Sequence, residues 1–74
     1  MFKVVITTFD EWDYRRFMDA IESHPFEDVT IISREPAGEK MLYSVKFDGT
    51  KTRNTDAHAY FVKRDLIAHV EPVA

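Results

Sequence analysis

Cysteine is absent from this chain of 74 residues, and none of its apolar runs is long. Without cysteine the protein forms no disulfide bonds, which fits a reducing compartment. A membrane span needs roughly eighteen or more consecutive apolar residues, and no stretch approaches that length. The N-terminal sequence MFKVVITTFDEW turns acidic where a signal peptide would continue its hydrophobic run. We therefore expect a cytoplasmic protein that does not associate with membranes.

Glycine is scarce, and the usual catalytic patterns are missing. The two glycines, Gly38 and Gly49, cannot form a glycine-rich phosphate-binding loop. Nucleophilic catalysis needs an activated side chain beside a base, and none of the three serines lies in a motif of that kind. The acids of residues 10–13, DEWD, are better explained by helix capping and the helix dipole. We therefore predict that the protein is not an enzyme and that it binds no cofactor.

Acidic and basic residues are distributed unevenly. The formal net charge is −3, but residues 1–28 carry seven acids and three bases, whereas residues 29–74 carry six acids and seven bases. The acidic first segment disfavours contact with the phosphate backbone of nucleic acids. The length allows a single domain, which covers residues 1–74.

A helix over about residues 10–24 is the clearest local prediction. Asp10 can accept hydrogen bonds from the free N–H groups of the first turn, and the acids that follow suit the positive end of the helix dipole. His24 precedes Pro25, whose ring cannot continue a helix. The apolar residues repeat at i, i+3, i+4 and i+7 and would form the buried stripe, which consists of Tyr14, Phe17, Met18 and Ile21.

Three segments, residues 2–9, 28–34 and 41–47, have the composition and the two-residue period of strands. The turn at Pro36-Ala37-Gly38 suits a tight hairpin between the last two. A polar connection, DGTKTRNTD, follows at residues 48–56. By alternation, the face that meets the helix would carry Phe2, Val4, Ile6, Val29, Ile31, Met41, Tyr43, Val45 and Phe47.

Residues 58–73, HAYFVKRDLIAHVEPV, allow two interpretations. Asn54 or Thr55 as a cap and Asp56 in the first turn predict a second helix near 55–67, which would give the β-α-β-β-α-β order of ferredoxin-like folds. The apolar positions make no clean helical stripe, however, and their alternation suits a hairpin that turns at residues 63–65. We favour the hairpin. The predicted fold is α+β, with one main helix on a mostly antiparallel sheet of four to five strands in the order β-α-β-β-β-β.

The other face of the predicted sheet should be polar if it meets water, but it is only partly so. A contiguous apolar patch commonly marks an interface, although strand twist and the long connection could hide such residues. We expect a small non-catalytic module that forms a homodimer or docks on a protein partner, which it could inhibit. With the hairpin, the candidate partner-binding residues on this face are Val5, Phe9, Ile32, Leu42, Tyr60, Val62 and Ile67.

Trp12 and Arg16 are a second pair of candidate partner-binding residues. Trp12 would point almost opposite the buried stripe of the helix, one turn before Arg16. Tryptophan and arginine are enriched at binding hot spots, and here they would stack as a cation–π pair. In the other interpretation, which we favour, Trp12 folds back over the helix end and covers the core, because tryptophan is often largely buried.

Single-stranded nucleic-acid binding by the basic segment 40–64 is the alternative function. Lys46, Lys51 and Arg53 would contact phosphates, and Tyr60 would stack on a base. The chain is acidic overall and lacks a strongly basic footprint, so nucleic acid is the less favoured partner.

The histidines suggest a weaker hypothesis, that of a metal site. In the hairpin, His58, His69 and Glu71 would converge, and these are side chains that zinc accepts as ligands. Their spacing matches no established zinc pattern, so we predict no bound metal. A pH-responsive interface is the other use of these histidines, and ordinary hydrogen-bonded surface histidines are the default.

Overall fold

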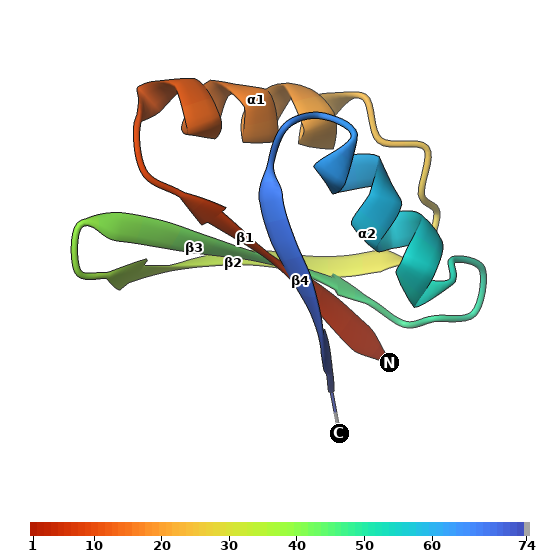
Figure 1. The fold of residues 1–74 in the computed structure, drawn as a ribbon. Helices are drawn as coiled ribbons and strands as arrows, with labels where there is room; N and C mark the ends of the chain where they lie inside the picture. The colour runs from red at the N-terminus through yellow and green to blue at the C-terminus, as the bar shows by residue number, and fades with distance from the viewer. Residues whose placement is uncertain (74) are drawn as a thin grey trace.

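The computed structural model describes residues 1–73. Its elements follow the order β-α-β-β-α-β. All strand pairs are antiparallel, the sheet order is β2-β3-β1-β4, and both helices lie on one side of the sheet (Figure 1). The elements are β1 (Phe2–Thr8), α1 (Glu11–Glu22), β2 (Val29–Ala37), β3 (Lys40–Phe47), α2 (Asn54–Val62) and β4 (Ile67–Pro72).

The α+β class is thus confirmed, but the favoured β-α-β-β-β-β order is wrong. The order of the elements is the one that we predicted for the ferredoxin-like alternative. No helix within residues 1–73 is long and apolar enough to cross a membrane.

α2 replaces the first strand of the predicted hairpin. Ala57 and Phe61, four residues apart and therefore on one helix face, are both fully buried. The chain then turns through Asp65, which has a positive φ of 61°, and Leu66 enters the core before β4 begins. The alternation that favoured a strand was misleading. So short a helix needs only these two buried positions, and it therefore does not show the extended apolar stripe of a longer helix.

α1 forms as the capping pattern predicts. The Asp10 carboxylate accepts a hydrogen bond of 2.9 Å from the N–H of Asp13, and the helix ends at Glu22, before Pro25. Of the predicted stripe only Phe17 is buried, whereas Met18 and Ile21 are half-buried and Tyr14 is 41% exposed; Ala20 is the other buried residue of α1. Phe17 stacks on Tyr43 of β3 with a ring-centroid distance of 4.4 Å, which fixes α1 over the middle of the sheet.

A β-bulge in β2 reverses part of the predicted alternation. Val29 lies opposite Phe47, but Ile31 lies opposite Lys46, so Thr30 is an extra residue in the ladder. An extra residue turns every following side chain to the other face. Ile31 therefore lies on the helix-free face and Ile32 on the helix side, the reverse of our prediction.

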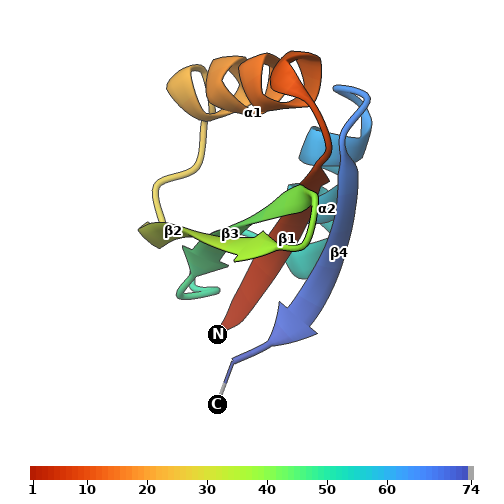
Figure 2. The same cartoon turned by 90° about the vertical axis from the view of Figure 1, so that its left-hand side faces the viewer.

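The core lies between the helices and the three strands β1, β3 and β4. Phe2 and Phe47 stack at 4.8 Å between ring centroids, and Val4, Ile6 and Val45 are fully buried beside them. β2 extends beyond this core at one edge of the sheet, and β4 forms the other edge (Figure 2). The residues of β2 from 30 to 36 are all exposed, because neither helix reaches across to cover them.

Candidate functional site

The helix-free face of the sheet consists of three rows of side chains, each of which crosses the strands in the order β4, β1, β3, β2. The strand register gives these rows as Glu71-Lys3-Lys46-Ile31, His69-Val5-Ser44-Ser33 and Ile67-Thr7-Leu42-Glu35. The first two rows are mainly polar or charged. This face is therefore not the continuous apolar surface that the sequence suggested.

Val5 lies at the centre of the helix-free face and is only 4% exposed. Its cross-strand neighbours are Ser44 and His69. Val5 therefore contributes to packing within the protein and offers little surface to a partner.

The third row is the apolar end of the helix-free face. Ile67 is 60% exposed, Leu42 is half-buried, and Thr7 lies between them. Phe9, just beyond the end of β1, is 57% exposed. Its backbone is fixed because the Phe9 N–H donates to the Asp13 carboxylate at 2.9 Å. We call Phe9, Leu42 and Ile67 the end patch.

Trp12 is 68% exposed in the first turn of α1, so it does not cover the core. The Arg15 guanidinium, not that of Arg16, lies over its ring, at 5.7 Å from the ring centroid. Arg16 is held instead in an ion pair with Asp13. A charge-assisted hydrogen bond of this kind is stronger than an exposed cation–π contact, which explains why Arg16 turns away from Trp12.

Tyr60 and Val62, predicted on the sheet, lie on α2. Tyr60 is half-buried between the helices, and its hydroxyl donates to the Ala20 carbonyl of α1 at 2.5 Å. The Arg64 guanidinium covers the ring at 3.6 Å from its centroid. Val62 is 45% exposed on the outside of the same helix.

The residues of the nucleic-acid hypothesis do not share one surface. Lys46 is on the helix-free face, whereas Tyr60 packs between the helices. Lys51 donates to Glu27 at 2.6 Å, and Arg53 lies 3.7 Å from Asp56. Two of the three cations are therefore paired with acids, and the aromatic ring lies on the other side of the sheet from Lys46.

His58 and His69, the two histidines of the metal-site hypothesis, make separate hydrogen bonds. His58 of α2 donates to the Ala68 carbonyl of β4 at 2.9 Å, and His69 donates to the Glu71 carboxylate at 2.6 Å. The hydrogen bond from His69 holds the pKa of Glu71 below its usual value, and Lys3 acts in the same direction. Within residues 1–73 no three histidine or acidic side chains come together as a metal site would require.

Asp28 is a buried anchor that the sequence did not reveal. It is only 4% exposed, and its carboxylate accepts from the backbone N–H groups of Lys51 and Thr52 at 3.1 and 3.0 Å and from the Thr52 hydroxyl at 2.6 Å. Burial raises the pKa of Asp28, but these hydrogen bonds outweigh burial and hold it below the usual value. The connection that leads into α2 is thereby fixed to the start of β2.

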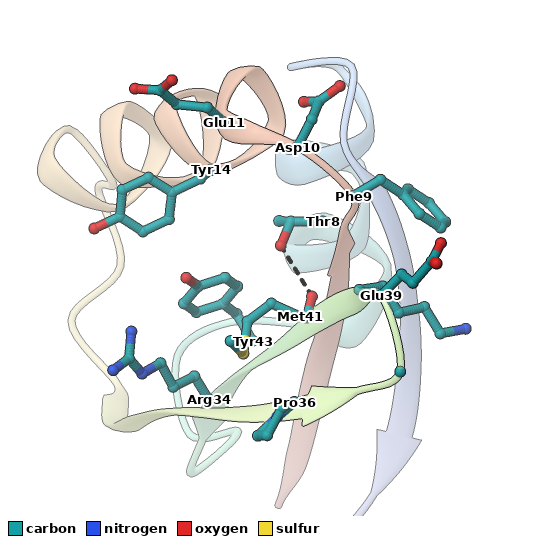
Figure 3. A pocket seen from close by; sticks show the side chains of 12 residues that line it. Thr8, Phe9, Asp10, Glu11, Tyr14, Arg34, Pro36, Glu39, Met41 and Tyr43 are labelled. Carbon is teal, nitrogen blue, oxygen red and sulfur yellow. Dashed lines mark hydrogen bonds between the residues drawn. The ribbon is translucent and has the colours of Figure 1, made fainter.

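An open hollow lies between the start of α1 and the β2–β3 hairpin (Figure 3). Tyr14 of α1 and Tyr43 of β3 face each other across it, with 6.0 Å between their ring centroids. Asp10, Glu11, Glu39, Arg34 and Lys40 also line it, so it carries charges of both signs. The Phe9 ring points away from the tyrosine pair. The hollow was not predicted, because its walls come from segments far apart in the sequence.

No protein-family model, curated protein sequence or solved structure matches this chain.

Proposed function

We propose that the protein is a non-catalytic protein-binding module that docks on a partner protein through the end patch and the neighbouring Trp12. The observation that carries this proposal is the exposure of large apolar side chains where β1 leads into α1. Phe9, Trp12 and Ile67 are 57%, 68% and 60% exposed. Isolated surface apolar residues are ordinary, whereas a group at one end of a small domain is typical of an interaction site.

The charge beside the end patch indicates what kind of partner it would fit. Asp10 and Glu11 are exposed next to Phe9 and Trp12, and residues 1–28 carry four more acids than bases. A complementary partner would offer an apolar depression with a basic rim, since matched charges steer association and fix the orientation of docking. Occlusion of such a basic surface would make the module an inhibitor of that partner.

The test is affinity capture from the native host, followed by binding measurements with the captured partner. Trp12→Ala and Ile67→Ser should each weaken binding at least about tenfold, as expected for exposed anchors that become buried in an interface. Ile32→Lys, which changes the helix side of β2, is the matched control and should bind as tightly as the unchanged protein. Equal binding by all of these variants would refute the proposal.

Single-stranded nucleic acid is the alternative ligand. Salt-sensitive binding of a labelled oligonucleotide that is lost in Lys46→Ala would support it against docking on a protein. The dispersed placement of Lys46, Lys51, Arg53 and Tyr60 is the reason that we rank it second.

A further inference from the structure

The two edge strands of the sheet, β4 and β2, differ in how far other parts of the protein cover them. α2 packs beside β4, and the His58 side chain donates to the Ala68 carbonyl of that strand at 2.9 Å. Pro72 at the end of β4 has no N–H to offer. These are the usual ways in which proteins block pairing at an edge.

The β2 edge has little of this protection. β2 is nine residues long, it is the last strand of the sheet, and residues 30–36 are exposed. β2 contains no lysine, its charged residues are the adjacent Arg34 and Glu35, and its bulge and Pro36 lie towards its two ends. The stretch from Ile31 to Glu35 is therefore an open edge, of the kind that readily accepts another strand.

The two exposed isoleucines of β2 indicate how this edge would be covered. Ile31 is 54% exposed on the helix-free face, and Ile32 is 42% exposed on the helix side. A partner that docks flat on one face would cover only one of them. A strand added along the edge projects side chains to both faces and would contact both residues.

We propose that β2 pairs antiparallel with β2 of a second copy of this chain, about a two-fold axis at Ile32, so that two four-stranded sheets become one. The charge of the strand favours a second copy. β2 carries one arginine and one glutamate and is neutral, whereas residues 1–28 carry seven acids and three bases. Two copies that meet through β2 therefore bring neutral segments together. This inference is independent of docking through the end patch.

The register about Ile32 is chosen from the residue pairs that it would place opposite each other. Ile32 would lie opposite Ile32 of the second copy, and Ile31 opposite Ser33. Regular pairing in both copies covers residues 31–33, which leaves the bulge at Thr30 and Pro36, which lacks an N–H, outside the pairing. The two copies of Arg34 would lie four residues apart along the strands, about 13 Å, which exceeds the Debye length of about 8 Å at physiological salt.

The experiment places a positive charge at Ile32 in one variant and a negative charge in another, and measures the association of each by sedimentation equilibrium. Pairing through one strand gives a small contact, of the class of weak interfaces below about 1,200 Å². The protein concentration in the experiment should therefore reach about 1 mM. Ile32→Lys and Ile32→Glu should each weaken dimerisation at least about tenfold, because like charges lie directly opposite across the axis. An equimolar mixture of the two variants should form a heterodimer at least as tight as the unchanged dimer.

Ile67→Lys is the control, since Ile67 is an exposed isoleucine of the other edge strand. It should leave dimerisation unchanged while it weakens partner binding through the end patch. The proposal is overturned if the unchanged protein stays monomeric throughout, if Ile32→Lys dimerises normally, or if the mixture associates no better than its components. Because the heterodimer forms only from folded chains, its appearance also shows that the substitutions do not act by unfolding the protein.

Discussion

The two helices of this protein are held in place by different means. α1 has twelve residues, an Asp10 side-chain cap, and two ion pairs along its own surface, Glu11–Arg15 and Asp13–Arg16. α2 has nine residues, and Arg53 at its N-cap makes no side-chain capping hydrogen bond. Besides the Arg53–Asp56 ion pair at its start, α2 makes hydrogen bonds to other elements, from Tyr60 to α1 and from His58 to β4.

This difference shows that one helix is specified by its own residues and the other by its neighbours. A helix of nine residues is too short to be stable in isolation, so α2 depends on the packing of its buried face. α2 is expected to open more easily than α1 when that packing is weakened. Four substitutions, taken in order of decreasing effect, test this contrast.

The largest effect is expected for Phe61→Ala. Phe61 is fully buried and packs within 6.4 Å of Phe17 between ring centroids. Loss of a buried phenylalanine costs about 3–5 kcal/mol, against a total stability of about 4–11 kcal/mol for a chain of this length. Chemical denaturation should show this loss, and amide hydrogen exchange should show that α2 opens before α1. Val62→Ala, on the exposed side of α2, should cost much less. Equal losses would show that α2 does not depend on its buried face.

An intermediate effect is expected for Asp28→Ala, which releases the connection that enters α2. The substitution leaves the N–H groups of Lys51 and Thr52 without their acceptor, and should cost about 1.5–3 kcal/mol at pH 7. Asp48→Ala, which removes hydrogen bonds only within the same turn, is the control with the smaller loss.

The contribution of Asp28 should also depend on pH. Since the folded-state pKa is lowered from 3.8, the stabilisation is complete above that value and is lost as the pH falls through the folded-state pKa. The difference in unfolding free energy between the unchanged protein and Asp28→Ala should therefore shrink in acid below about pH 4. A difference that stays constant down to pH 2 would argue against the ionised carboxylate as the anchor.

The smallest effects are expected at the two caps. Asp10→Ala should destabilise the protein by about 1 kcal/mol because α1 loses its cap. Arg53→Ser should stabilise it by about 0.5 kcal/mol, because the extended backbone at this position suits a capping hydroxyl that α2 lacks. Thermal unfolding of both variants gives the comparison, and changes of the same sign would contradict it.

The same contrast explains which parts of the fold could be predicted from the sequence. α1 was predictable because Asp10, the apolar stripe and Pro25 act within one segment. α2 was not favoured, since Ala57 and Phe61 are its only buried residues and its contacts with Ala20 and Ala68 come from distant parts of the chain. The bulge could not be foreseen either, because nothing in the residue type of Thr30 distinguishes it from a regular strand residue.

The candidate site was predicted in part for a similar reason. The exposure of Ile67 follows from the period of a strand, whereas the exposure of Trp12 is contrary to the interpretation that we favoured from the sequence. The burial of Val5 depends on its neighbours across the sheet, and the turn of Arg16 towards Asp13 depends on its neighbours along the helix. Composition and spacing do not predict which of these contacts form.

The bulge at Thr30 determines which side chains of the outer strand lie on the helix side. Regular pairing of Thr30 with Lys46 would shift every following residue by one position along β3 and exchange the two sides of β2 from residue 31 onward. Ile32 and Arg34 would then move to the helix-free side, and Ile31 and Glu35 would take their places, while β3 kept its sequence. A shift in register without any change of sequence would thus give this edge a new set of contacts.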